Sequence, residues 1–200
     1  MNTSEAINSR RAVKHFDPTH EMTEEEIKTL FNSVLLSPTS FNIQHWRFVV
    51  VRDKALREQV KAKAWGQAQI TDASLLVILT GDIKAYEKNP ARYWEGAPKE
   101  ASDVLVPMIG QYYGGREDVQ RDEVMRSTGI AAQTLMLAAQ EMGYDSCPMV
   151  GFDYQGVAEI INLPSDHLIS MIVTVGKATK PAYARCGKLP YSEVVIRDRF

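Results

Sequence analysis

The sequence predicts a single globular domain in which helices and strands alternate along the chain. Its 200 residues include 44% hydrophobic and 24% charged residues, close to the average of soluble globular proteins. A chain of this length buries a sizeable core without disulfide support. No repeat, low-complexity segment or Pro/Gly-rich boundary divides it, so residues 1–200 are expected to form one domain.

The first half of the chain predicts three helices and two strands. A short helix is expected from Ser4 to about Ser9, and a longer one from about Thr23 to Leu36, which opens with a Thr-Glu-Glu-Glu capping box. Trp46–Val51 alternates and is β-branched, which indicates a strand. Leu56–Trp65 has helical composition, and the apolar run Leu75–Leu79 predicts a fully buried strand.

The second half predicts three more helices, a strand and a tail. Helices are expected at Ala101–Tyr113, at about Asp122–Met142 and at about Tyr154–Ile161, and the last strand at Ser170–Val175. The second of these helices is apolar nearly all round, which indicates burial either in a large core or against a partner chain. Residues 177–200 have little apolar periodicity and are expected to form an extended arm that packs over another surface.

Charge and composition exclude several classes of function. With 23 Lys+Arg and 25 Asp+Glu the net charge is −2 and the basic residues are scattered, so no nucleic-acid partner is expected. Cys147 and Cys186 form neither a disulfide framework nor a zinc site, which favours a reducing, cytoplasmic location. The N-terminus lacks an apolar signal region and Leu75–Leu79 is too short to span a bilayer, so no membrane partner is expected.

Common catalytic motifs are missing from the sequence. There is no G-x-G-x-x-G, P-loop, H-E-x-x-H or G-x-S-x-G motif. The four histidines have no ligand-like spacing, so no metal site is expected, and His20 and His167 are interpreted as solvated loop residues. Cys147 has no neighbouring base and is interpreted as a structural thiol. No side-chain nucleophile is evident.

Three segments are instead rich in groups that bind a planar, phosphorylated cofactor. Residues 10–14 place three cations within five positions, residues 37–48 combine hydroxyl and amide groups with little charge, and Gln67 and Gln69 offer two amides before the buried strand. Taken singly, the first segment is more often a solvated basic face. The alternative for the second is an ordinary turn, but ordinary turns seldom combine Asn, Gln and Trp with so much hydrogen-bonding capacity and so little charge.

These segments, together with Pro148-Met149-Val150-Gly151 and Val173-x-x-Gly176-Lys177, resemble the nitroreductase family of flavin-dependent oxidoreductases over essentially the whole chain. The resemblance rests on four motifs in the same order, which begin at Ser9, Ser37, Pro148 and Val173. It implies an α+β, nitroreductase-like fold with a central, mostly antiparallel sheet flanked by helices. It also implies an intertwined homodimer with an extended C-terminal arm and two FMN sites at its interface.

The resemblance further implies roles for individual residues. Arg10, Arg185 and Lys188 would hold the FMN phosphate, and Arg11 and Ala12 would follow the ribityl chain. The remaining cofactor-binding residues that it implies are Lys14, Ser37, Pro38, Thr39, Ser40, Asn42, Gln44, Gln67, Gln69, Pro148, Met149, Val150 and Gly151.

Among these, Lys14 is expected beside the N1/O2 edge of the flavin, where its charge stabilises the reduced, anionic form. Gln67 and Gln69 are expected at the pyrimidine edge or the ribityl hydroxyls. Residues 37–44 would reach across from the partner subunit, and a backbone N–H within 148–151 would point at flavin N5. No side chain is expected to be catalytic.

The implied function is the reduction of nitroaromatic, quinone or similar electron-poor acceptors by NADH or NADPH, through ping-pong two-electron (hydride) transfer on FMN. One alternative is a flavin-binding module that senses redox state or docks a partner without significant turnover. Another is a relative acting on flavin itself or on a halogenated aromatic. Five aromatic residues are candidates for a lid or pocket, although packing in the core is the commoner role: Phe41, Trp65, Trp94, Tyr112 and Tyr113.

Overall fold

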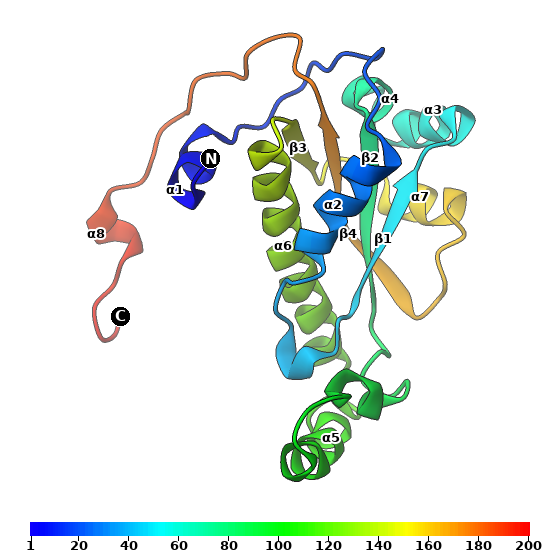
Figure 1. The fold of residues 1–200 in the computed structure, drawn as a ribbon, viewed down its shortest axis with the longest axis vertical. Coiled ribbons are helices and arrows are strands. Elements are labelled where there is room, and N and C mark those ends of the chain that lie inside the picture. The colour runs from blue at the N-terminus through cyan, green and yellow to red at the C-terminus, as the bar shows by residue number, and fades with distance from the viewer.

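A four-stranded antiparallel sheet forms the centre of the protein in the computed structural model, which describes residues 1–200 (Figure 1). The strands are β1 (Trp46–Val51), β2 (Leu75–Asp82), β3 (Asp145–Met149) and β4 (His167–Gly176), in the order β1-β2-β4-β3. Every residue of β2 is buried, because β2 pairs with β1 on one side and β4 on the other. The predicted α+β class with a mostly antiparallel sheet is confirmed.

Helices cover both faces of the sheet (Figure 1). On one face lie α2 (Glu24–Val34) and α6 (Glu117–Glu141), and on the other α3 (Lys54–Lys63), α4 (Gln69–Asp72) and α7 (Tyr154–Ile160). Alternate residues of β2 supply the two cores: Leu75, Val77 and Leu79 pack toward α2 and α6, whereas Leu76 and Ile78 pack toward α3 and α7. The apolar run in the sequence is therefore a strand buried on both faces.

Local sequence signals determine where α2 begins. The Thr23 side chain accepts a hydrogen bond from the Glu26 N–H, and the Glu26 carboxylate accepts one from the Thr23 N–H. This confirms the predicted capping box, which satisfies two donors of the first turn.

The long helix α6 departs from the expectation of burial on most sides. It packs one face against the sheet, while Ile130 is 39% exposed and Leu137 is half-buried. Within this chain the helix is therefore covered on one face only. Its burial against a partner chain stays a prediction.

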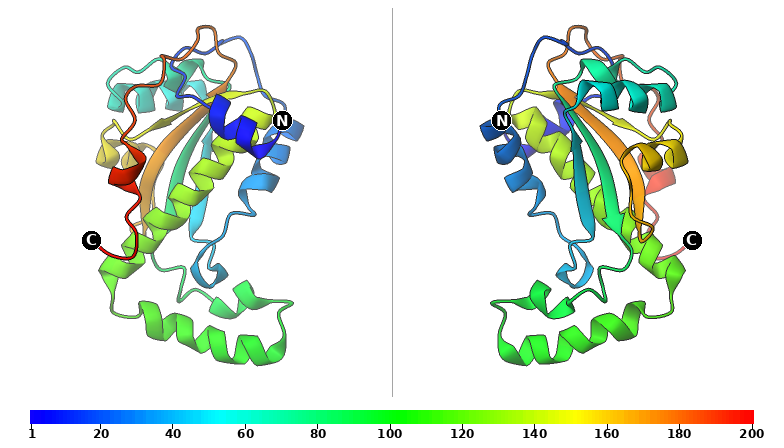
Figure 2. Two further views of the ribbon diagram at one scale, coloured as in Figure 1. Left: turned by 90° about the vertical axis from the view of Figure 1, so that its left-hand side faces the viewer. Right: turned by 90° about the vertical axis from the view of Figure 1, so that its right-hand side faces the viewer.

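Between β2 and α6 the chain leaves the body and returns. This excursion contains the 3-10 helix η2 (Pro90–Trp94) and α5 (Lys99–Tyr113), which lie beyond one end of the sheet (Figure 2). Ile109 and Tyr113 pack inward, whereas Val104, Met108 and Tyr112 form an exposed row at four-residue intervals.

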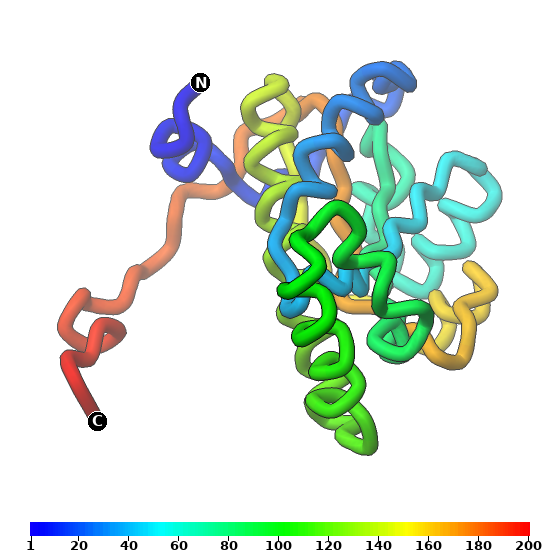
Figure 3. Tube along the Cα trace, turned by 60° about the horizontal axis from the view of Figure 1, so that its bottom comes forward, coloured from blue at the N-terminus to red at the C-terminus, as the bar shows by residue number.

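The N-terminal helix and the C-terminal tail lie on the same side of the body, with the two chain ends well apart (Figure 3). The N-terminal α1 spans Thr3–Ser9, and the tail contains only the short α8 (Tyr191–Val194). The Arg185 guanidinium donates to the carbonyl of Ile7 at 3.2 Å and to that of Asn8 at 3.0 Å, which fixes this part of the tail beside α1. Residues 183–200 are all exposed in the chain, and their packing on a partner subunit stays a prediction.

Some elements were not predicted. Besides β3, they include α4, α8 and the 3-10 helices η1 (Ser40–Asn42) and η2.

The interpretation of His167 as a solvated loop residue is wrong: it begins β4, its side chain is 13% exposed, and its ring bonds to Asp166. His20 does lie in a loop, but it is half-buried with Nε2 3.2 Å from the Tyr144 hydroxyl. None of the helices combines the length and apolar content that crossing a bilayer requires.

Candidate cofactor-binding site

The basic segment 10–14 lies beside the edge strand of the sheet. The Val13 N–H donates to the Ser146 carbonyl at 3.0 Å, and Ala12 forms a parallel bridge with Ser146 of β3. This pairing half-buries Arg10 and leaves Lys14 exposed at the sheet edge. The segment is thus fixed by backbone bonds while its cationic side chains remain free of ion pairs.

Cys147 lies next to these cations. Burial raises the pKa of its thiol, and the charges of Lys14 and Arg10 oppose that rise only in part. The side chain is 3% exposed. A buried thiol with a raised pKa stays protonated, in agreement with the structural role predicted for Cys147.

Two amide side chains connect the segment before β2 to the loop after β3. The Gln69 amide donates to the Gln67 side-chain oxygen at 3.1 Å, and the Gln67 amide donates to the Gly151 carbonyl at 2.9 Å. Trp65 and Gly66 adopt left-handed φ angles of 54° and 72°. They form the turn between the end of α3 and Gln67. Gln67, itself bonded to Gln69, therefore holds residues 148–151 in place; we call these residues, which end β3 and begin the turn after it, the 148–151 loop.

The 148–151 loop presents free donors. Met149 is buried and Val150 is 64% exposed, and the backbone N–H groups of Val150 and Gly151 donate to no acceptor in the chain. A Cβ at position 151 would come within 2.7 Å of the Trp65 ring, so a side chain there would displace the ring. The Trp65 ring nevertheless stays 74% exposed, since it touches the loop with one edge.

We call residues 10–14, Gln67, Gln69 and 148–151 the cofactor half-site. Arg185 lies at its edge, because its guanidinium donates to the Arg10 carbonyl at 3.1 Å. Lys188 is exposed and forms no hydrogen bond or ion pair with the half-site. Unpaired cations, two free N–H donors and neighbouring amides fit a ligand that combines a phosphate with a heteroaromatic ring.

The polar segment 37–44 lies at the opposite end of the sheet. Trp46, which follows it, pairs with Gly81 of β2, whereas Ser146 beside Ala12 is level with Leu75. Six residues of strand separate the two levels by about 20 Å. A single chain therefore does not bring this segment to the half-site, and its contribution from a partner subunit stays a prediction.

The side chains of segment 37–44 are mostly bonded within the chain. Ser37 Oγ is 3.0 Å from Thr134 Oγ1, the Asn42 amide donates to the Tyr93 carbonyl at 2.8 Å, and the Gln44 N–H donates to Thr39 Oγ1 at 3.0 Å. Residues 41, 42 and 44 have φ angles of 51°, 55° and 51°, in the left-handed region that side chains disfavour. The loop is held in a fixed, strained conformation. Pro38 is exposed and Ser40 half-buried at its surface.

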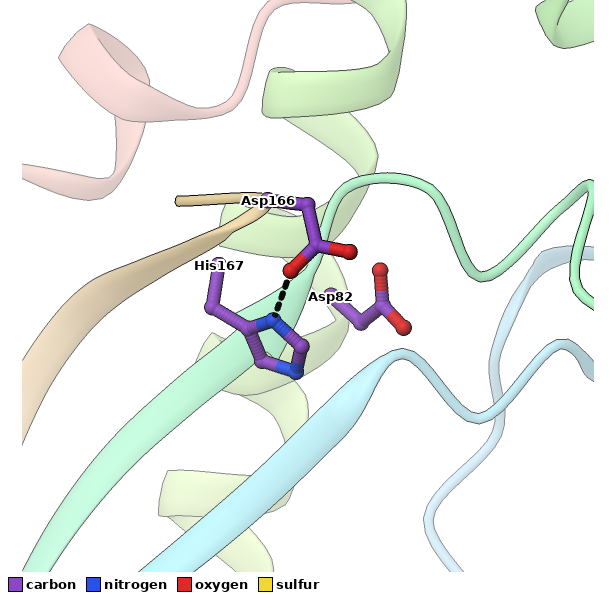
Figure 4. A group of neighbouring side chains, drawn as sticks. All are labelled: Asp82, Asp166 and His167. Atoms are coloured by element: carbon purple, nitrogen blue, oxygen red, sulfur yellow. Dashed lines mark hydrogen bonds and ion pairs between the residues drawn. The ribbon is translucent and has the colours of Figure 1, made fainter. Parts of the chain in front are cut away.

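A second polar cluster contains Asp82, Asp166 and His167, whose ligand atoms lie within 4.8 Å of one another (Figure 4). Sequence spacing did not reveal it, because the pairing of β2 with β4 brings its members together. The Lys88 ammonium lies 2.8 Å from Asp82 and 2.5 Å from Asp166, and the His167 ring lies 2.7 Å from Asp166. These bonds lower the pKa of Asp166 to about 2. The Lys88 ammonium thus already occupies this cluster. Its two ion pairs hold the chain just before η2 against the sheet.

The fold and the site together are a helix-covered antiparallel sheet with a cationic half-site at its edge. The model of the nitroreductase family matches residues 7–177. The chain belongs to the nitroreductase family, and is an oxidoreductase by that membership.

Similar proteins extend over nearly the full length. The chain is 53% identical to protein DrgA of Synechocystis sp. over 182 residues, covering 91% of this chain and 87% of DrgA. It is 34% identical over 197 residues to MhqN of Bacillus subtilis, provisionally named an NAD(P)H nitroreductase, covering 94% and 95% of the two chains. The structure of a provisionally named nitroreductase of Exiguobacterium sibiricum in complex with FMN superposes with a TM-score of 0.90 at 26% identity, covering 98% and 97%.

Proposed function

We propose that this protein is an FMN-dependent oxidoreductase that uses NADH or NADPH to reduce nitroaromatic, quinone or similar electron-poor acceptors. The observation that carries the proposal is the half-site, where unpaired cations and two free N–H donors meet at the edge of the sheet. The similar Exiguobacterium protein binds FMN, which supports the same cofactor here. FMN, when bound, supplies the two-electron redox chemistry that the side chains lack.

The chain's own residues bind and polarise that cofactor. Arg10 offers a guanidinium to the phosphate, and Arg185, which is held beside it, adds charge. Lys14 carries a fixed positive charge at the sheet edge, which favours a ring that becomes anionic on reduction. The N–H groups of Val150 and Gly151 provide donors at the ring, and Gln67 keeps them in place through the Gly151 carbonyl.

The complete site requires two chains. Segment 37–44 is preorganised but lies far from the half-site of its own chain, so its surface is available to the half-site of a second copy. The exposed apolar row of α5 and the open face of α6 around Ile130 supply surfaces that such a dimer would cover. The tail from 177 onward, exposed in one chain, would pack on the partner.

Trp65 forms a wall of the acceptor site in this proposal. Its ring is fixed against Gly151 yet largely exposed, so it offers a flat apolar surface beside the free donors of the loop. Planar aromatic acceptors gain from stacking on such a surface.

Anaerobic addition of NADH or NADPH to the purified, yellow protein tests the function. We expect rapid loss of the yellow absorbance, its restoration by a quinone, and parallel double-reciprocal plots for the two substrates. A yellow colour that persists after both nucleotides are added would instead identify a flavin-binding module without turnover.

A further inference from the structure

A polar cavity of about 410 Å³ lies between α3, α4 and the loop that precedes α2. None of the half-site residues lines it. The helix α4 separates the two regions, with Gln69 bonded in the half-site and Thr71 and Asp72 on the cavity wall. The cavity is thus a distinct space.

Arg57 is the buried charge of this cavity. The residue is 8% exposed, and its guanidinium donates to the carbonyls of Val51 at 2.8 Å, Ala73 at 2.5 Å and Ser74 at 3.1 Å. Three of its five N–H groups are used in this way, which leaves two. No carboxylate forms an ion pair with it.

A buried guanidinium without a counter-ion is unfavourable, because carbonyl oxygens replace only part of its hydration. Burial lowers the pKa of Arg57, and the neighbouring Arg52 lowers it further. Arg57 is therefore a positive charge without a counter-ion on the wall of an open cavity. An anionic ligand in the cavity would stabilise this charge.

Further cations line the same wall. Lys61 Nζ lies 3.3 Å from Thr71 Oγ1 and 3.7 Å from Glu58, and Lys54 forms no ion pair. Four cationic side chains line the cavity, but Arg52 forms an ion pair with Glu24, which leaves three cations facing the three carboxylates of Glu21, Glu58 and Asp72. Glu21 is exposed, so water screens its charge and it does not compensate Arg57.

We propose that this cavity binds a small molecule through a phosphate group, which Arg57 and Lys61 hold and whose charge Lys54 helps to balance. A phosphate offers three acceptor oxygens, which match the two unused N–H groups of Arg57 and the two lysine ammonium groups. The volume leaves room for a further small group beside the phosphate.

Amide NMR of the FMN-saturated, ¹⁵N-labelled protein titrated with inorganic phosphate tests the proposal. Saturation with FMN fills the half-site, so the titration reports the cavity, and failure to retain FMN is seen separately in the absorbance spectrum. We expect saturable shifts at Lys54, Arg57, Lys61 and Thr71, and weaker binding of acetate.

The variants Lys61→Met and Lys54→Met test the proposal. Arg57 is left unchanged, because its guanidinium donates to three backbone carbonyls and its replacement would destabilise the fold. We expect Lys61→Met to weaken phosphate binding about tenfold, the loss of one charge-assisted bond. Lys63→Met is the matched control on the same helix, since Lys63 pairs with Asp153 outside the cavity. The absence of saturable shifts, equal weakening by Lys63→Met, or tighter binding of acetate than of phosphate would each overturn the proposal.

Discussion

The half-site and segment 37–44 are both polar, but they use their polar groups in opposite ways. In the half-site the backbone is paired with β3, Arg11 donates to the Tyr183 carbonyl, and the side chains of Arg10 and Lys14 and two N–H donors stay free. In segment 37–44 the amides and hydroxyls are bonded within the chain and the backbone is strained. The first arrangement is suited to capture a charged ligand, whereas the second presents a rigid surface. The difference supports the proposal that the two regions are complementary parts of one site, contributed by different chains.

Charge reversal in the half-site has the largest expected effect. Arg10→Glu should weaken FMN binding by about 1,000-fold, because it removes charge-assisted bonds to the phosphate and adds repulsion. Fluorescence titration of FMN against apoprotein measures this. Lys28→Glu, an exposed site on α2, is the matched control. An equal loss in both variants would show that net charge, not the half-site, governs binding.

His45, next to segment 37–44, should make that rigid region acid-sensitive. Its ring is 2% exposed with an unpartnered Nδ1, and burial lowers its pKa to about 4 although Glu123 and Asp82 oppose this. As pH falls from 6.5 toward 4, the unfolded chain takes up a proton that the folded chain does not. The free energy of unfolding should therefore fall, by on the order of 3 kcal/mol in total.

Urea unfolding of the wild type and His45→Leu across this pH range measures the effect. The variant should lose most of the dependence, whereas His15→Leu, at an exposed histidine, should keep it. Parallel pH profiles for the wild type and His45→Leu would contradict a buried neutral imidazole.

Trp65→Ala should raise KM for nitroaromatic and quinone acceptors about tenfold, as expected for the loss of an aromatic stacking contact. FMN affinity should change little, because the largely exposed ring supplies none of the charged or hydrogen-bonding groups assigned to FMN. Steady-state kinetics with each acceptor measure this, and Trp65→Phe should restore most of the affinity. An unchanged KM in Trp65→Ala would remove Trp65 from the acceptor site.

Lys14→Met should lower the flavin potential and slow reduction by NAD(P)H about tenfold, since about 1.4 kcal/mol of charge stabilisation is lost. Phosphate binding should be retained, because Arg10 is intact. Potentiometric titration and stopped-flow reduction measure the two quantities. Unchanged values in both would show that Lys14 is only a solvated lysine.

The sequence predicted the elements whose signals are local. Trp46–Val51 is β-branched and Thr23–Glu26 forms a capping box, so β1 and α2 were predicted within a few residues. The strand β3 was missed because Asp145 and Pro148 have low strand propensity. It exists because β4 and the Val13 N–H offer it partners across the sheet.

The cofactor role of the candidate site stays a prediction. The sequence grouped residues 10–14, Gln67, Gln69 and 148–151, but hydrogen bonds among them, such as Gln67 to Gly151, join residues 84 positions apart and leave no trace in spacing. The ion cluster of Asp82 and Asp166 was missed for the same reason. Both depend on strand register, which tertiary packing decides.

Mixed dimers test most directly whether the site is shared between two chains. Arg10→Glu disables the half-site, and Ser40→Trp places a bulky ring on the surface of segment 37–44. When differently tagged variants are combined and the heterodimer is isolated, one of its two sites contains only wild-type residues. The shared site predicts that each variant alone retains no FMN and that the heterodimer retains one FMN per two chains. A heterodimer that retains none, or a monomer that retains FMN, would contradict it.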